Sequence, residues 1–408
     1  YEGKQLSLLD DEEKMRINVF DWKKEFKEIM DGGGFDAVIG NPPYGAEFDQ
    51  NASEYVSDRY STYVLRIESY IIFLERALQL LRNDGLFGYI IPDTYLNLAF
   101  SKAIRRHLLA NSRLLQLVVL PSNVFEAAVV DTTILFASKA PKVHQFHPSS
   151  VFIRSFNKKT SIYGLTKADR EQYVNTELWW KQESFNVQAT SREHIVLSKL
   201  DRETLTIDSI AEMFSGIKAY EVGKGTPPQT EMTREKKPFT SDNKRGDEWL
   251  PLFDGKHVGR YELLWKKNNW IKYGPWLAAP REATNFLGEK ILIRKIVGAT
   301  LISTYVKETS YCNTLLFILK LKSESKLSHE YILGILNSRL IGWYFRKKFQ
   351  ISSEDTFPQI MIRDILQFPI PRADKTRHDK MVELVEQMLA LHKQLPATKT
   401  AGKPAAKT

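Results

Sequence analysis

The sequence has 408 residues, of which 43% are hydrophobic and 26% charged, so it is long enough for two or three domains with full cores and is not expected to be disordered. No apolar segment approaches the length of a membrane span, and the first twenty residues lack the basic start and apolar centre of a signal peptide, so we expect a cytoplasmic protein with no membrane association. The single cysteine, Cys312, excludes an internal disulfide and a thiolate zinc site, and we expect it to be buried.

The net charge of +9 is unevenly distributed along the chain. Residues 1–140 contain 15 Lys and Arg against 20 Asp and Glu, a net charge of −5, whereas the remaining residues contain 43 against 29, a net charge of +14. A basic tail explains little of this excess, because only Lys399, Lys403 and Lys407 lie in the last thirteen residues. The later part of the chain is therefore predicted to bind a polyanion.

Residues 15–140 alternate short apolar runs with helical patterns, which predicts an α/β domain with a mainly parallel sheet. A helix is predicted over residues 63–81, with Asn83-Asp84-Gly85 ending it. A second helix is predicted over residues 101–109. The expected strands are residues 17–20, 35–39, 86–91, 115–120 and 133–137.

After residue 140 the sequence pattern changes. Residues 141–205 are interpreted as a mixed connector without a definite architecture. Residues 206–372 interleave Tyr, Trp, Lys and Arg with recurring Gly and Pro, which favours a β-rich or α+β domain with long loops. Residues 373–408 are expected to form a helix, over 381–391, followed by a disordered tail.

The most informative segment runs from Phe35 to Gly45, where an apolar strand leads into the stiff polar turn Asn41-Pro42-Pro43-Tyr44. By composition alone, that tetrapeptide is expected in a chain of this length with odds on the order of one in a thousand. Open α/β sheets bind ligands at the carboxyl ends of their strands, where this turn would lie. The alternative is a rigid Pro-Pro turn closed by an aromatic side chain.

These residue types suit chemistry on an aromatic amine. The exocyclic amine of adenine is a poor nucleophile because its lone pair is delocalised into the ring, and two acceptors aimed at its hydrogens would help to localise that pair. The Asn41 side-chain oxygen and the Pro42 carbonyl can be those acceptors, since proline fixes the backbone and brings no competing N–H. Tyr44 can then stack on the base, which is worth roughly 1–3 kcal/mol.

Asn41-Pro42-Pro43-Tyr44 resembles the catalytic motif of amino-methyltransferases, and its surroundings resemble the TaqI-like (gamma-class) DNA adenine-N6 methyltransferases of restriction-modification systems. The resemblance implies that this turn is catalytic, that Asp21 and Phe73 contact the cofactor S-adenosylmethionine, and that Phe125 flanks a flipped-out adenine opposite Tyr44. The alternatives are that both phenylalanines are ordinary core residues and that Asp21 is a solvated or helix-capping residue. The matching segments are residues 17–21, 73–77, 80–85, 88–92 and 124–125.

The basic region, residues 205–372, resembles the C-terminal specificity domain of the same family. Most of its matching residues are expected to be framework, with polar loop residues reading the bases. The matching segments are residues 252–256, 290–294, 335–338, 357–360 and 368–371. Candidate phosphate contacts, each with the alternative of a merely solvated side chain, are Lys218, Lys244, Arg245, Lys256, Arg281 and Lys295.

The fold class implied is α/β, with an incomplete Rossmann-like methyltransferase sheet in residues 1–140 and an α+β target-recognition domain in residues 206–372. The family's glycine-bearing cofactor motif, upstream of the catalytic turn, is absent; neither Gly32-Gly33-Gly34 nor Gly223-Lys224-Gly225 has the strand-to-helix setting that it needs. We therefore expect part of a longer bacterial or archaeal polypeptide, whose upstream part completes the S-adenosylmethionine site and can include a nuclease. These residues alone should have little activity, and no metal site is predicted in them.

The resulting hypothesis is a site-specific methyltransferase acting on adenine N6 in double-stranded DNA. Two rival functions stay open. The same turn resembles those of enzymes that methylate glutamine in release factors or guanine in ribosomal RNA, although such enzymes usually lack a large domain after the catalytic one. Alternatively, the chain is a DNA-specificity module that is inactive on its own.

Overall fold

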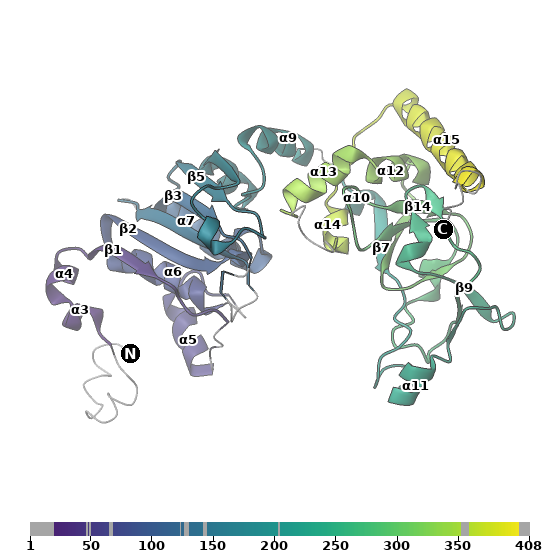
Figure 1. Cartoon of the computed structure of the whole chain (residues 1–408), viewed down its shortest axis with the longest axis horizontal. Coiled ribbons are helices and arrows are strands. Elements are labelled where there is room, and N and C mark those ends of the chain that lie inside the picture. The colour runs from purple at the N-terminus through teal and green to yellow at the C-terminus, as the bar shows by residue number, and fades with distance from the viewer. Residues whose placement is uncertain are drawn as a thin grey trace, which may run out of the picture. The chain divides into compact units, whose positions relative to one another are not determined.

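The structure, a computed structural model, divides into two compact units, Tyr1–His194 and Ile195–Thr408 (Figure 1). It describes residues 20–45, 48, 50–64, 68–122, 124–125, 130–141, 145–202, 205–351 and 359–399. Each unit has its own sheet and its own hydrophobic core.

The first unit contains a six-stranded sheet with the order β1-β2-β4-β3-β5-β6. The β1–β2 and β3–β5 pairs are parallel, whereas the other three pairs are antiparallel. The α/β class is confirmed, but the prediction of a mainly parallel sheet is wrong. The apolar pattern along a strand reports which face of that strand is buried, and it does not report the direction in which the strand runs. The strands are β1 (Phe35–Gly40), β2 (Leu81–Pro92), β3 (Ser112–Val119), β4 (Thr132–Lys139), β5 (Ser150–Ser155) and β6 (Arg170–Asn175).

Helices α6 (Ser69–Leu80) and α7 (Lys102–Asn111) pack on this sheet and contribute to its main core. The predicted helix over residues 63–81 is correct in its centre but not at its ends. Leu81 has an extended backbone (φ −76°, ψ 145°) and begins β2, so Asn83-Asp84-Gly85 lies inside the strand instead of ending the helix. Residues 65–67 of that prediction lie outside the described residues. The remaining elements of this unit are α5 (Gln50–Arg59), η1 (Asp93–Leu96), η2 (Ala99–Ser101) and η3 (Ile162–Gly164).

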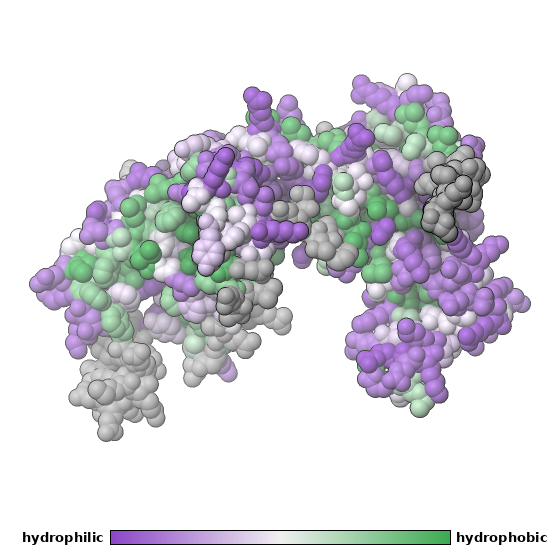
Figure 2. Space-filling view, in the orientation of Figure 1, coloured by the Kyte–Doolittle hydropathy of each residue, from purple (hydrophilic) through white to green (hydrophobic). Residues whose placement is uncertain are grey.

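The sheet face opposite the main core carries a row of exposed apolar side chains. The strand register aligns Ile39 with Gly88 and Gly88 with Phe136. Ile39 is 88% exposed, and Tyr173 on β6 is 64% exposed. Figure 2 shows hydrophobic side chains gathered at the surface over β1 and β2. This face is therefore more apolar than the solvent face of an ordinary half-exposed sheet.

Residues 141–205 are not a connector, which corrects the sequence interpretation. β5 and β6 extend the six-stranded sheet, and α8 (Thr176–Gln182) follows them directly. On α8, Trp179 is fully buried and stacks on Phe185, with the ring centroids 4.7 Å apart. The boundary between the two units falls after His194, within α9 (Ser191–Asp201), and not at residue 140.

Two short helices, α3 (Trp22–Glu25) and α4 (Lys27–Asp31), precede the sheet. The rings of Trp22 and Phe26 lie 5.9 and 5.2 Å from the ring of Phe35, at the start of β1. The strand predicted over residues 17–20 lies outside the described residues except for Phe20, which is not in a strand.

The second unit contains two four-stranded sheets, with the orders β15-β9-β12-β8 and β14-β13-β16-β7, and a two-stranded β10–β11 ribbon. Cys312 is fully buried between them, as expected. The strands are β7 (Ala211–Ser215), β8 (Thr240–Ser241), β9 (Trp249–Phe253), β10 (Val258–Gly259), β11 (Glu262–Leu263), β12 (Trp270–Lys272), β13 (Lys290–Arg294), β14 (Ser303–Val306), β15 (Tyr311–Cys312) and β16 (Leu316–Leu321).

Helices complete the second unit and make it α+β. In the described part of the chain, no helix is both long enough and apolar enough to cross a membrane. The helices are α10 (Ile207–Ile210), α11 (Glu231–Lys236), η4 (Gly255–His257), η5 (Ala283–Phe286), α12 (His329–Leu336), α13 (Arg339–Lys348), α14 (Ile362–Leu366) and α15 (Lys375–Lys399).

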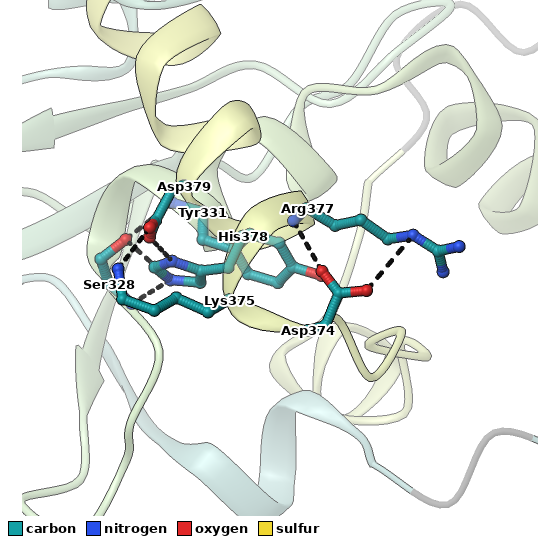
Figure 3. A network of polar contacts seen from close by, with 7 residues as sticks. All are labelled: Ser328, Tyr331, Asp374, Lys375, Arg377, His378 and Asp379. Atoms are coloured by element: carbon teal, nitrogen blue, oxygen red, sulfur yellow. Dashed lines mark hydrogen bonds and ion pairs between the residues drawn. The ribbon is translucent and has the colours of Figure 1, made fainter.

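Helix α15 contains the predicted helix of residues 381–391 and packs on α12 (Figure 3). The His378 ring stacks on Tyr331, with the centroids 4.9 Å apart, and its Nε2 accepts a hydrogen bond from the Ser328 N–H at 3.4 Å. Further along, a Cβ on Gly334 would lie 2.9 Å from both Met381 and Val385, so this glycine permits the close approach of the two helices. The predicted disordered tail falls largely on residues 400–408, which lie outside the described residues.

Candidate functional site

Two glycines position β1 and the turn that follows it. Gly34 precedes the strand with a φ of 119°, and a Cβ there would lie 2.4 Å from the Leu80 carbonyl oxygen, so the chain requires glycine at this position. At the carboxyl end of β1, a Cβ on Gly40 would lie 3.1 Å from the Tyr89 ring. β1 therefore packs closely against β2 and delivers Asn41 to the carboxyl end of a parallel pair, as predicted.

Asn41 and Tyr44 contact each other across the turn. The Tyr44 hydroxyl donates a hydrogen bond to Asn41 Oδ1 at 2.6 Å, and the Ile90 carbonyl oxygen, near the end of β2, lies within hydrogen-bond distance of the same hydroxyl at 3.1 Å. Partial burial raises the pKa of Tyr44, so its hydroxyl stays protonated at neutral pH. The tyrosine therefore holds the asparagine amide in one orientation.

The proline pair is fixed from the side of α6. Ser69, the first residue of that helix, donates its hydroxyl to the Pro43 carbonyl at 2.7 Å. Pro42 is buried, whereas Asn41 and Pro43 are exposed. The turn is consequently rigid without being enclosed in the protein core, which leaves its polar atoms accessible to a ligand.

Phe125 lies beside Tyr44, and its predicted role of flanking a flipped-out base stays a prediction. Their ring centroids are 6.4 Å apart with an interplanar angle of 72°, and Tyr70 contacts the other side of Tyr44 at 6.5 Å. Because the Tyr44 and Phe125 rings meet edge to face, a planar base could enter between them only if one ring rotated. The structure thus brings Asn41, Pro42, Pro43, Tyr44 and Phe125 together in one site.

This arrangement can bind an amine after one local change. Asn41 Oδ1 accepts the Tyr44 hydroxyl in the structure, so an incoming amine must replace that donor. The Ile90 carbonyl can then accept the hydroxyl proton, because it already lies 3.1 Å away. Rotation of one hydroxyl would therefore free the asparagine acceptor without leaving the tyrosine unsatisfied.

Of the two predicted cofactor contacts, only Phe73 lies on an element next to the turn. It follows Ser69 by one turn of α6, and its side chain is 44% exposed, so it is available to a bound group. Asp21 instead accepts hydrogen bonds from the Lys23 and Lys24 backbone N–H groups and caps α3.

That helix packs at the start of β1, and six strand residues separate it from Asn41, a length of about 20 Å. Asp21 thus lies at the opposite end of β1 from the turn and acts as a helix cap, and its contact with the cofactor stays a prediction.

In the second unit, backbone contacts bring four of the six candidate phosphate contacts to one end of the β13–β16–β7 sheet. Lys218 and Ala279 exchange two backbone hydrogen bonds. Lys218 therefore lies opposite a residue that precedes Arg281 by two positions. The Lys295 N–H donates to the Leu315 carbonyl, and Gly255, next to Lys256, packs on the Leu315 side chain. Lys218, Lys256 and Arg281 are exposed, and Lys295 is partly exposed.

The other two candidates lie elsewhere. Lys244 and Arg245 precede β9, at the end opposite Lys256, where Lys244 pairs with Asp247 and the Arg245 guanidinium lies over the Trp249 ring at 5.3 Å. Figure 2 shows that the surface around α11 and β9 is mostly hydrophilic. We refer to Lys218, Lys256, Arg281 and Lys295 as the cationic end of the second unit.

The sequence did not reveal several residues that support the site. Ser69 and Ile90 contact the turn directly, and Asp131 and Lys158 lie at the base of the segment that carries Phe125. A serine at the start of an apolar helix was a visible signal for Ser69. Ile90, Asp131 and Lys158 come near the site only in the folded chain, so the sequence held no signal for them. Within the described ranges, no group of three or more His, Cys, Asp or Glu side chains could hold a metal ion.

Two family models match the chain. Residues 2–125 match the Eco57I restriction-modification methylase, and residues 250–370 match the TaqI-like C-terminal specificity domain. These matches cover the Asn41 turn and Phe125 in the first unit and three of the four residues of the cationic end in the second.

Curated relatives match over longer stretches. A protein of Methanocaldococcus jannaschii named as a type II restriction enzyme and methyltransferase is 28% identical over 367 residues, covering 88% of this chain and 29% of the relative. The Escherichia coli type II restriction enzyme and methyltransferase RM.Eco57I is 25% identical over 197 residues, covering 44% of this chain and 18% of the relative. The chain thus spans less than a third of the length of these relatives.

Among solved structures, the type IIL restriction-modification enzyme MmeI in complex with DNA superposes with a TM-score of 0.57 and 9% identity, covering 92% of this chain and 51% of MmeI. At this identity the similarity shows the fold alone. The sequence matches go further: the chain carries an Eco57I-type methylase region followed by a TaqI-like C-terminal specificity domain, and its curated relatives are type II restriction enzymes and methyltransferases.

Proposed function

We propose that this chain provides the catalytic turn and the target-recognition domain of a DNA methyltransferase that modifies the N6 amine of adenine with S-adenosylmethionine as the methyl donor. The observation that carries the proposal is the Asn41–Tyr44 geometry: an accessible amide oxygen and an aromatic ring, fixed at the carboxyl end of β1. The restriction-modification relatives support the assignment to DNA.

In this proposal Asn41, Pro42 and Tyr44 act on the base in different ways. Asn41 Oδ1 and the Pro42 carbonyl accept the two hydrogens of the adenine amine and so orient its lone pair away from the ring. Tyr44 and Phe125 stack on the two faces of the flipped-out base, which compensates for the stacking lost in the duplex. S-adenosylmethionine, when bound, supplies an electrophilic methyl group, and Phe73 is the described residue best placed to contact it.

The second unit is proposed to bind double-stranded DNA through its cationic end. Its four cations come from four separate segments, which suits contacts to several phosphates along a backbone. Replacement of counterions by these side chains predicts binding that weakens steeply as salt rises.

The decisive experiment replaces Asn41 with Ala in the full-length protein. Methylated positions in genomic DNA are first mapped for the wild type by sequencing that detects N6-methyladenine. The N41A variant is expected to lose methylation while its affinity for duplex DNA changes little, because Asn41 is exposed in the turn and supports no core packing. Methylation of RNA or of a protein glutamine by the wild type, with DNA left unmodified, would refute the proposal and favour the rival amine methyltransferases.

A further inference from the structure

Three residues close a ring at the base of the segment that carries Phe125. The Ser122 hydroxyl donates to Asp131 Oδ1 at 2.7 Å, and Lys158 Nζ donates to Asp131 Oδ2 at 2.9 Å. The Ser122 backbone N–H donates in turn to the Lys158 carbonyl at 3.1 Å. We call Ser122, Asp131 and Lys158 the clamp. It joins β3, β4 and the connection between β5 and β6.

The clamp is tied to the strand that supports Tyr44. The Asp131 carbonyl accepts a hydrogen bond from the Asp93 N–H at 2.9 Å, directly after the end of β2. On the same strand, the Ile90 carbonyl lies 3.1 Å from the Tyr44 hydroxyl. A displacement of Asp131 would therefore shift both the segment that carries Phe125 and the strand that supports Tyr44.

Phe125 itself is held from a second direction. Its neighbour Val124 packs in a small apolar cluster that includes Ile90, Leu120 and Phe156. Phe156 precedes Lys158 by two residues, so the cluster and the clamp share the same connection. Val124 fixes one side of the segment and the clamp fixes its base, which leaves the Phe125 ring facing Tyr44.

The charges of the clamp are set for neutral pH. The side chains of Lys158 and Asp131 are 36% and 35% exposed, so the ion pair is partly shielded from solvent. Burial alone would raise the pKa of Asp131, but the bonds from Ser122 and Lys158 hold that pKa below its usual value. The carboxylate of Asp131 is therefore ionised at neutral pH.

We propose that Asp131 and Lys158 are positioning residues that hold Phe125 beside Tyr44, where rotation of one ring lets both rings stack on a flipped-out base. This inference rests on the proposed function of the Asn41 turn. The hydrogen bonds and the ion pair described for the clamp involve neither Asn41 nor Tyr44, so its effect should fall on how well the target base is retained and not on the acceptors that orient its amine. The β5–β6 connection thereby takes part in target-base binding.

The test uses Asp131→Asn and Lys158→Met in the full-length protein, with Glu171→Gln as the matched control. Glu171 on β6 pairs with Arg154 on β5 at 2.9 Å, and the connection that carries Lys158 joins these two strands. Its replacement therefore removes a comparable ion pair away from Phe125. The probe is a duplex with 2-aminopurine at the mapped target adenine, whose fluorescence rises when the base leaves the stack.

Asp131→Asn and Lys158→Met are expected to reduce the fluorescence rise and to increase KM for DNA by about three- to tenfold, with kcat within about twofold of wild type. Lys158→Arg should retain most of both signals, because it keeps the charge, and Glu171→Gln should match the wild type. If Asp131→Asn does not fold, the comparison of Lys158→Met with Lys158→Arg decides.

The positioning role is overturned if the clamp variants match Glu171→Gln in both fluorescence and KM. It is also overturned if kcat falls while KM and fluorescence stay at wild-type values, since the clamp would then act on the chemistry. Absence of DNA methylation by the wild type would refute the proposed function together with this inference, whereas normal wild-type methylation with unaffected variants would refute the inference alone.

Discussion

At the scale of single residues, the site depends on a tyrosine that does two things. In the proposed function its ring stacks on the base, and in the structure its hydroxyl donates to Asn41 Oδ1 at 2.6 Å with the Ile90 carbonyl as a second acceptor. A phenylalanine or tryptophan at this position could stack but could not orient the asparagine from the same place. The two roles can therefore be separated by mutation.

Replacing Tyr44 with Phe should lower kcat for DNA methylation by about two- to tenfold, the range expected for one neutral hydrogen bond, while KM for DNA changes little. Tyr44→Ala should lose a further roughly 1–3 kcal/mol of stacking and raise KM. Steady-state methyl transfer measures both, with Tyr163→Phe, on an exposed side chain in η3, as the control. A rate increase in Tyr44→Phe would mean that the hydroxyl blocks Asn41 instead of orienting it.

In the second unit, the side chain that we consider at the scale of single residues is a buried lysine. Lys290 is fully buried at the start of β13, and its ammonium donates to the carbonyls of Phe286, Gly288 and Glu308 at 2.8–2.9 Å. Burial lowers the pKa of Lys290 to about 8, which still leaves the amine mostly protonated at neutral pH. The ammonium thus joins the segment before β13 and the segment after β14 to β13, an inner strand of the β14-β13-β16-β7 sheet.

Lys290→Met should cost about 1–3 kcal/mol of unfolding free energy, because it removes the donor that satisfies three carbonyls in a poorly solvated place. Urea unfolding followed by circular dichroism measures the loss. Lys326→Met, at an exposed position before α12, serves as the control and should change the unfolding free energy by less than about 0.5 kcal/mol. Equal stabilities of the two variants would show that the three carbonyls find other donors.

At the scale of elements, the sequence predicted features formed by residues that are close together in the chain. The apolar run from Phe35 and the proline pair placed β1 and the Asn41 turn correctly in the fold, and the burial of Cys312 followed from its isolation. β5 and β6 were missed because the open sheet face also carries aromatic residues, such as Phe152 and Tyr173, which blur the two-residue alternation.

Contacts between distant segments were also out of reach of the sequence. Ser69 and Ile90 contact the turn from α6 and β2, and Lys158 pairs with Asp131 from the β5–β6 connection; a single sequence contains no signal for such pairings. Asp21 is ambiguous for a different reason: an aspartate before a short helix serves equally well as a cap, and the fold uses it as one, so its contact with the cofactor stays a prediction.

The attachment of α15 is an element-level feature that can be tested. His378 joins α15 to α12 by a ring stack on Tyr331 and by a hydrogen bond from Ser328 (Figure 3). His378→Ala should therefore lower the unfolding free energy of the helix by about 1–2 kcal/mol. Hydrogen exchange of residues 375–394 should accelerate accordingly, whereas Lys380→Ala, which removes an exposed pair with Glu383, should leave it almost unchanged. Unchanged protection in His378→Ala would assign the docking to Met381 and Val385 instead.

At the scale of the whole molecule, the cationic end and the residues proposed to be catalytic lie in different units. The Asn41 turn lies in the unit that begins with an acidic region, and the cationic end lies in the basic one. Affinity for the DNA backbone and chemistry on the base should consequently respond to different mutations. This separation allows the contribution of the cationic end to be measured without an active enzyme.

The salt dependence of duplex DNA binding provides that measurement. If Lys256, Arg281 and Lys295 each neutralise one phosphate, replacing all three with Ala should reduce the slope of log K against log salt by about 2.7, because each contact contributes roughly 0.9. The matched control is Lys375→Ala, Lys380→Ala and Lys393→Ala on α15, which removes the same charge from an exposed helix and should change the slope by less than about one. Similar slopes for the two triple variants would indicate a general effect of net charge, and the cationic end would then have no specific place in DNA binding.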